Sequence, residues 1–217
     1  MTARRCGWME ETTFGLEVPF KSPISRLDWM RQMVALDERH TSRLTLCRMS
    51  ANDLDDLTRM HLDPRVMATL GGLRSPEVTR AWLNDHLEHW RIYGYGLWLA
   101  RERETGAFAG RGGLHRVEIG GREEIEVGYS FLAEFWGRGL AVELARESIL
   151  VAFTVLDLPE IVCFTLTTNR ASERVMQKAG FRREGEVIYK DLPHVLYRLR
   201  RADFVIESET IRDAPLP

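Results

Sequence analysis

One stretch of this chain, residues 124–144, constrains its fold more than any other. Apolar and polar residues alternate along 124–131, which is the period of a β-strand with one buried face. Gly137 and Gly139 interrupt that alternation, and apolar residues recur at helical spacing from Leu140 onwards. The stretch therefore predicts a half-buried strand, a glycine turn and a long helix in direct succession.

The glycine turn has the chemistry of an anion-binding site. Gly137 and Gly139 can adopt backbone angles that are closed to other residues, and they let a ligand approach the main chain closely. The helix that follows begins with unpaired N–H groups at the positive end of its dipole, which suits a diphosphate. Arg138 adds a cation at the same place. Because short glycine motifs recur by chance, an ordinary tight turn is the alternative interpretation.

Two blocks of sequence together resemble the GNAT superfamily of N-acyltransferases. Trp136–Ala141, which follows EIEVGYSFL, resembles the acetyl-CoA-binding motif of that family, and Thr168–Phe181, TNRASERVMQKAGF, resembles a second block of it. Tryptophan at the first place of the motif is typical of the branch that resembles the ribosomal-protein-alanine N-acetyltransferases. The resemblance covers about residues 41–204. It implies an α/β GNAT fold, with a mixed, mostly antiparallel seven-stranded sheet that is splayed at its central strands and flanked by helices.

The resemblance implies that acetyl-CoA binds along the central strand, the glycine turn and the second block. A bulge at Gly128 and Tyr129, of the kind that the family carries on this strand, would free backbone N–H groups and open a slot for the pantetheine arm. Asn169 matches an asparagine that bonds the pantetheine chain, and a helix cap is its alternative role. The residues implied in cofactor binding are Val127, Tyr129, Trp136, Gly137, Arg138, Gly139, Leu140, Ala141, Asn169 and Ser172.

Acetyl transfer to an amine needs a base that removes the ammonium proton, and it benefits from an acid that protonates the leaving thiolate. Glu126 is the candidate base, because the family often uses a carboxylate on this strand. Glu124 is a rival, and a solvated strand glutamate is the alternative interpretation. The resemblance implies Ser172 as the candidate acid, because the branch has a serine at this position that meets the thiol sulfur. Met176 stands where many other family members have a tyrosine, and a thioether cannot donate a proton. The alternative role of Ser172 is a hydroxyl at a helix start.

The implied activity is direct acetyl transfer to a primary amine, without a covalent acyl-enzyme. The branch favours a protein N-terminal amine. The alternatives are a small amine (amino acid, polyamine or aminoglycoside) and a non-catalytic module that binds acyl-CoA. Candidate acceptor contacts are Gly71 and Gly72, in a loop between two predicted helices, and Tyr189 and His194, beside the turn of the last predicted hairpin. A plain flexible connection is the alternative for the glycine loop.

Composition and spacing exclude several classes of partner. The chain has 217 residues and a net charge of −2, so it lacks the basic footprint of a nucleic-acid-binding protein. No apolar run is long enough to span a membrane. His86 and His89 have no third ligand nearby, so we expect no metal. Three widely spaced cysteines without a CxxC pair favour unpaired thiols and a cytoplasmic protein.

We expect one GNAT domain with a segment on either side. Residues 1–40 are predicted to form an N-terminal extension that is flexible or contains one helix, because the related enzymes usually begin near Thr41. Residues 41–205 form the acetyltransferase domain, and the polar residues 206–217 form a C-terminal tail. The sequence leaves a monomer and a homodimer equally open.

Overall fold

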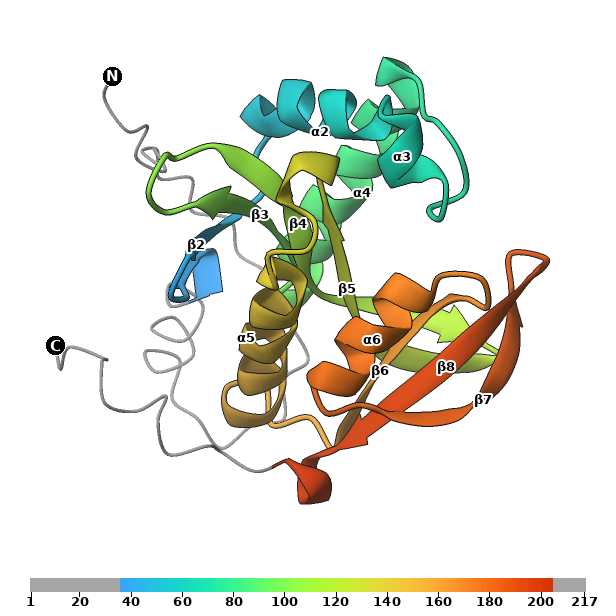
Figure 1. The fold of residues 1–217 in the computed structure, drawn as a ribbon. Helices are drawn as coiled ribbons and strands as arrows, with labels where there is room; N and C mark the ends of the chain where they lie inside the picture. The colour runs from blue at the N-terminus through green and yellow to red at the C-terminus, as the bar shows by residue number, and fades with distance from the viewer. Residues whose placement is uncertain (1–35, 205–217) are drawn as a thin grey trace, which may run out of the picture.

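The computed structural model describes residues 36–204, and the predicted N-terminal helix and C-terminal tail lie outside them. A single eight-stranded sheet runs through the described residues in the order β1-β2-β3-β4-β5-β6-β8-β7 (Figure 1). The elements are β1 Glu38–His40, β2 Leu44–Arg48, α2 Leu54–His61, α3 Pro64–Met67, α4 Pro76–Tyr93, β3 Leu97–Glu102, β4 Phe108–Ile119, β5 Arg122–Phe131, α5 Leu140–Thr154, β6 Glu160–Leu166, α6 Arg170–Lys178, β7 Arg182–Tyr189 and β8 Leu192–Arg200.

The sheet is mixed and splays at its centre, as predicted. All neighbouring strands pair in antiparallel fashion except β5 and β6, which are parallel. The β5–β6 register consists of one pair, Glu126 opposite Val162, after which the two strands separate. The sheet has eight strands rather than the predicted seven, because β1 adds an edge strand beside β2. Leu36 is buried before β1, and its carbonyl accepts a hydrogen bond from Trp98 Nε1 at 2.7 Å.

The bulge predicted at Gly128 and Tyr129 is absent from the pairing of β5 with β4. The register is continuous along the whole ladder, with Gly128 opposite Gly113 and Tyr129 opposite Gly112. The turn that joins the strands is the physical reason. It is a two-residue turn in which Gly120 and Gly121 both have positive φ, so it fixes the register. The gap beside β5 therefore arises where β6 diverges, and no extra residue in β5 is needed.

Helices cover both faces of the sheet. Helices α5 and α6 lie on one face, and α2 and α4 lie on the other (Figure 1). The α5 face is tightly packed, since a Cβ at Gly112 would come within 2.5 Å of Leu144. On the α4 face the buried Trp90 donates a hydrogen bond to the Leu97 carbonyl at 2.9 Å. Odd- and even-numbered residues of β5 point to opposite faces of the sheet, so their side chains lie in two different environments.

Two further expectations concern cysteines and membranes. Cys163 is a buried free thiol, but Cys47 is disulfide-bonded, so the expectation of unpaired thiols is wrong for Cys47. No described helix combines the length and the apolar character that crossing a bilayer requires.

A buried cation ties the far half of the sheet together. The Arg198 guanidinium on β8 donates to both oxygens of Glu124 on β5, at 3.0 and 2.8 Å, and to Glu160 on β6 at 2.7 Å. It also bonds Glu184 on β7, and this contact holds the pKa of the Glu184 carboxyl below its usual range. The side chains of Arg198 and Glu124 are only 7% and 8% exposed. Four strands thus share one charged group.

Replacing Arg198 with methionine should lower the free energy of unfolding by about 3–5 kcal/mol, because it removes the buried partner that donates to both oxygens of the buried Glu124 carboxylate. Urea denaturation of the wild type and the variant measures the change. The matched control is Arg200→Met on the same strand, whose side chain is 65% exposed and 3.7 Å from Glu160. It should change stability by no more than about 0.5 kcal/mol. Equal losses in both variants would contradict the assigned role of Arg198.

Candidate active site

The glycine turn presents a row of free backbone amides. Gly137 and Gly139 have φ values of 73° and 78°, and Gly139 is the N-cap of α5. No N–H group from Gly137 to Val142 donates a hydrogen bond to an acceptor in residues 36–204. The predicted turn therefore exists, and its amides remain available to an anion at the positive end of a long helix.

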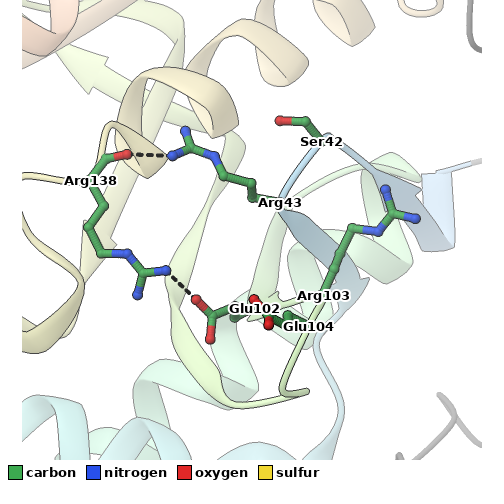
Figure 2. Close-up of a pocket in the computed structure, with 6 residues that line it drawn as sticks. All are labelled: Ser42, Arg43, Glu102, Arg103, Glu104 and Arg138. Carbon is green, nitrogen blue, oxygen red and sulfur yellow. Dashed lines mark hydrogen bonds and ion pairs between the residues drawn. The ribbon is translucent and has the colours of Figure 1, made fainter.

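The turn is held in place from outside by Arg43, which sequence reasoning missed. Arg43 Nη1 donates to the Arg138 carbonyl at 2.7 Å, as Figure 2 shows, and Arg43 Nε donates to Glu143 Oε2 at 2.7 Å. Glu143, in the first turn of α5, also accepts bonds from the backbone N–H of Arg43 and the hydroxyl of Thr41. These bonds link the start of β2 to the glycine turn and fix the direction of the Arg138 carbonyl.

The side chain of Arg138 bonds a neighbouring carboxylate. Its guanidinium pairs with Glu102 at the end of β3 (Figure 2). It also lies 5.2 Å from the centre of the Phe135 ring. The bond to Arg138 is the main reason why the pKa of Glu102 lies below its usual range. Arg138 thus lies at the turn, but Glu102 neutralises part of its charge. An open pocket here is lined by Ser42, Arg43, Glu102, Arg103, Glu104 and Arg138.

The second sequence block meets β5 on the α5 face of the sheet. Asn169 caps α6, since its Oδ1 accepts from the Ser172 N–H at 3.1 Å. The Ser172 hydroxyl lies 2.9 Å from the Tyr129 hydroxyl, which also donates to the Ser172 carbonyl. Burial raises the pKa of the Tyr129 hydroxyl and of the neighbouring Cys163 thiol well above their usual values, so both stay protonated. Met176 is fully buried.

Glu126 lies on the opposite face of β5. Its side chain is 12% exposed, and its Oε2 is 3.2 Å from Nε2 of His115, its cross-strand partner on β4. Burial raises the pKa of Glu126 to about 8, and the nearby charges of Arg111 and Lys190 oppose that rise. The rival Glu124 is held by Arg198 instead. Glu126 is therefore the carboxyl on this strand that can exchange a proton near neutral pH.

Around Glu126 the α4 face carries a group of buried polar side chains that we name the cleft cluster. Each has one buried nitrogen that finds no hydrogen-bond partner in residues 36–204. Burial lowers the pKa of its imidazoles, to about 3 for His61 and His115 and about 2 for His86, so they are neutral. No described group of three or more potential ligands could hold a metal ion. The cleft cluster consists of His61, Arg74, His86, Arg111 and His115.

The predicted acceptor residues lie in two places. Gly71 and Gly72, with φ of 88° and 89°, form the loop between α3 and α4 and have open space around them. Tyr189 and His194 flank the β7–β8 turn, with ring centres 5.6 Å apart. Burial and the Glu126 carboxylate both raise the pKa of Tyr189, which puts this hairpin within electrostatic reach of Glu126. The structure shows no contact between the two places.

Known proteins resemble this chain in sequence and in fold. The Acetyltransferase (GNAT) domain family matches residues 43–182. The uncharacterized protein YkkB of Bacillus subtilis (strain 168) is 34% identical over 143 residues, which cover 64% of this chain and 82% of YkkB. An acetyltransferase from Agrobacterium tumefaciens superposes with a TM-score of 0.67 at 22% identity, over 88% of this chain and 99% of its own. An aminoglycoside acetyltransferase solved with coenzyme A gives 0.62 at 20% identity, over 78% and 99%.

A splayed mixed sheet with an amide-lined turn at the end of its central strand defines an acyltransferase of the GNAT fold. The chain belongs to the GNAT family of acetyltransferases.

The raised pKa of Glu126 should make stability depend on pH. The folded state keeps this proton up to about pH 8, whereas an ordinary glutamate loses it near 4.5, so folding stability falls between these values as pH rises. Glu126→Gln mimics the protonated form. It should therefore gain stability over the wild type by up to about 1 kcal/mol per pH unit in this range.

Thermal unfolding of both proteins from pH 5 to 9 measures the difference. The control is Glu123→Gln, because the Glu123 side chain is 73% exposed on the same strand. The stability difference between this variant and the wild type should not change with pH. A difference for Glu126→Gln that is also independent of pH would contradict the raised pKa.

Proposed function

We propose that this protein transfers the acetyl group of acetyl-CoA directly to a primary amine. One observation carries the proposal: strand β5 holds Glu126 on one face and Tyr129 on the other, and it leads through a 3-10 turn into the free amides of Gly137–Val142. A carboxyl able to take up a proton and an anion-binding turn are thus joined to one strand. Because β6 pairs with β5 at a single position, we place the extended cofactor arm where the two strands diverge.

The residues present fit acetyl-CoA as the donor. The amides after Trp136 would hold its diphosphate, with Gly137, Gly139, Leu140 and Ala141 supplying the main chain. The pantetheine arm would follow the backbone of Val127 and Tyr129 into the gap beside β6. Asn169 uses its Oδ1 to cap α6, which leaves its amide NH₂ group to meet the arm.

The chemistry follows from the two faces of β5. Glu126 takes a proton from the acceptor ammonium, directly or through one water, and the free amine attacks the thioester carbonyl. A carbon–nitrogen bond forms, and the carbonyl oxygen becomes an oxyanion that backbone N–H groups of β5 stabilise. When the carbon–sulfur bond breaks, the pair of hydroxyls on Ser172 and Tyr129 supplies a proton to the thiolate. The second proton that the attacking nitrogen loses on becoming an amide restores this hydroxyl pair through solvent. The thiol of Cys163 stays protonated, which disfavours a covalent acyl-enzyme.

The acceptor class is the finer part of the proposal. Trp136 and the block around Ser172 support the ribosomal-protein-alanine branch, and with it a protein N-terminal amine. A small amine is the second candidate, and the acceptor would enter between the Gly71–Gly72 loop and the Tyr189–His194 hairpin. A cytoplasmic location stays a sequence prediction. Release of free thiol from acetyl-CoA over a panel of peptides and small amines tests the function. Cofactor binding without turnover of any amine would favour a non-catalytic module.

Gly137→Ala should weaken acetyl-CoA binding by about tenfold or more, because a Cβ would stand where the diphosphate approaches the main chain. The strain of a left-handed alanine also costs about 1–2 kcal/mol of stability. Gly106→Ala is the matched control, since Gly106 has φ of 71° and equally open surroundings in another turn. It should lose the same stability and keep wild-type affinity by calorimetry. Equal affinities in both variants would place the diphosphate elsewhere.

The rate should rise with pH up to about 8, because Glu126 accepts a proton only after losing its own. We expect kcat/KM to increase about tenfold per pH unit below this value and to level off above it. Glu126→Gln should lower kcat by about 10²–10⁴ and abolish this rise of kcat/KM with pH. Measurements with two acceptors of different amine basicity show whether the governing pKa belongs to the enzyme or to the substrate. A pKa that shifts with the acceptor would contradict the assignment to Glu126.

A further inference from the structure

One buried cation on the α4 face has no anionic partner in the part of the chain that the structure describes. Arg111 on β4 is only 8% exposed, and its Nε finds no acceptor in residues 36–204. The guanidinium lies 4.4 Å from the centre of the Trp82 ring on α4. No described carboxylate lies within ion-pair distance of it. Stacking on an aromatic ring does not replace the hydrogen bonds that a buried guanidinium needs, so this arrangement is costly as it stands.

A second guanidinium faces the same ring. Arg74 follows the Gly71–Gly72 loop, is half-buried, and lies 6.0 Å from the centre of the Trp82 ring. Its Nη2 donates to the Leu70 carbonyl at 3.2 Å, but its buried Nη1 has no partner in the described chain. Burial is the main reason why the pKa of Arg111 falls to about 9, and the charge of Arg74 adds to that fall. Two like charges thus lie close enough to repel each other, and both face the Trp82 ring.

Among the described residues, the carboxyl that acts electrostatically on Arg111 is already engaged. Glu126 influences Arg111 at a distance, but its carboxyl bonds His115. The imidazoles of His61, His86 and His115 are neutral and add no negative charge. The cleft cluster thus carries a surplus of positive charge and two unused guanidinium donors, next to the proposed base. Such a site is complementary to a small anion.

We propose that the acceptor amine carries its own carboxylate, which Arg111 and Arg74 bind while Glu126 receives the ammonium proton. The inference rests on the proposed function and selects among its acceptors. A guanidinium matches a planar carboxylate with two parallel hydrogen bonds, and burial beside Trp82 makes those bonds strong. The acceptor is then a compact amino acid whose amine and carboxylate bridge from Glu126 to the two arginines.

The same charge balance disfavours the other acceptors. A polyamine or an aminoglycoside would bring several positive charges toward two uncompensated guanidinium groups, which costs binding energy. At a protein N-terminus the carboxyl group beside the amine is consumed in a peptide bond. A free amino acid offers both groups at once. The charge of the cleft cluster therefore points away from the protein acceptor that the branch resemblance favours.

Matched pairs of acceptors test the inference. Thiol release is measured for α- and ω-amino acids, each beside its own amide, which keeps the amine and removes the carboxylate. We expect kcat/KM to favour the acids by at least about tenfold, although the amides have the less basic amines. In Arg111→Gln this ratio should fall about ten- to a hundredfold, mainly through KM, which is the worth of a buried charge-assisted hydrogen bond. Arg74→Gln should lower it in the same direction.

The control is Arg116→Gln, which removes a guanidinium from the same strand but outside the cleft cluster. Arg116 pairs with Glu123 at 2.6 Å, and its loss should leave the ratio at the wild-type value. Circular dichroism verifies that each variant is folded. If Arg111→Gln fails to fold, the same ratio of acid to amide is measured in Arg74→Gln, where the replaced side chain is only half-buried. A ratio near one in the wild type, or a ratio unchanged in the folded variants, would overturn the inference and leave the acetyltransferase proposal intact.

A binding measurement covers the case in which no amine is turned over. Calorimetry in the presence of coenzyme A compares N-acetylglycine with N-acetylglycinamide, which differ only in the carboxylate. Preferential binding of the acid, lost in Arg111→Gln or Arg74→Gln, would support the anion site even if the proposed catalysis failed. Equal binding of the two compounds, or binding of neither, would overturn it.

Discussion

The pairing of β4 with β5 is the interaction on which the rest of this structure depends. A two-residue glycine turn, Gly120–Gly121, sets a register that holds over the whole ladder. That register places His115 opposite Glu126 and leaves Gly112 under Leu144, so that α5 can approach the sheet. A slip of one residue would exchange the two faces of β5 and put the carboxyl among the apolar side chains under α5. The position of the Glu126 carboxyl in the site therefore depends on the strand register more than on any loop.

The two faces of β5 carry different kinds of chemistry. On the α5 face, the hydroxyls of Tyr129 and Ser172 bond each other in a well-packed environment. On the α4 face, five buried side-chain nitrogens have no hydrogen-bond partner within residues 36–204. Unpartnered polar groups cost stability, and a chain keeps such groups together where a ligand completes them. The contrast supports the proposal that the cofactor binds on one face and a polar acceptor on the other.

Sequence reasoning predicted the strand, the glycine turn and the start of α5 at Leu140, because these depend on local periodicity and backbone freedom. The pairing of His115 with Glu126 could also be predicted, since the Gly120–Gly121 turn implies it by counting back along the hairpin. The stacking of Arg111 on Trp82 could not be predicted, because it joins β4 to a helix distant in sequence. β1 has only three residues, too few for alternation to show, and the direction of Arg138 depends on Glu102 from another strand.

The link from Arg43 to the glycine turn has a consequence for where this catalytic unit begins. Arg43 and Thr41 precede β2, yet they bond the first turn of α5 and the Arg138 carbonyl, about a hundred residues downstream. Truncation just before Leu44 would preserve every strand from β2 onwards. It would nevertheless release the free amides of the glycine turn from their anchor. The functional border of the domain is therefore defined by two side chains in a connecting segment, upstream of the secondary structure that they serve.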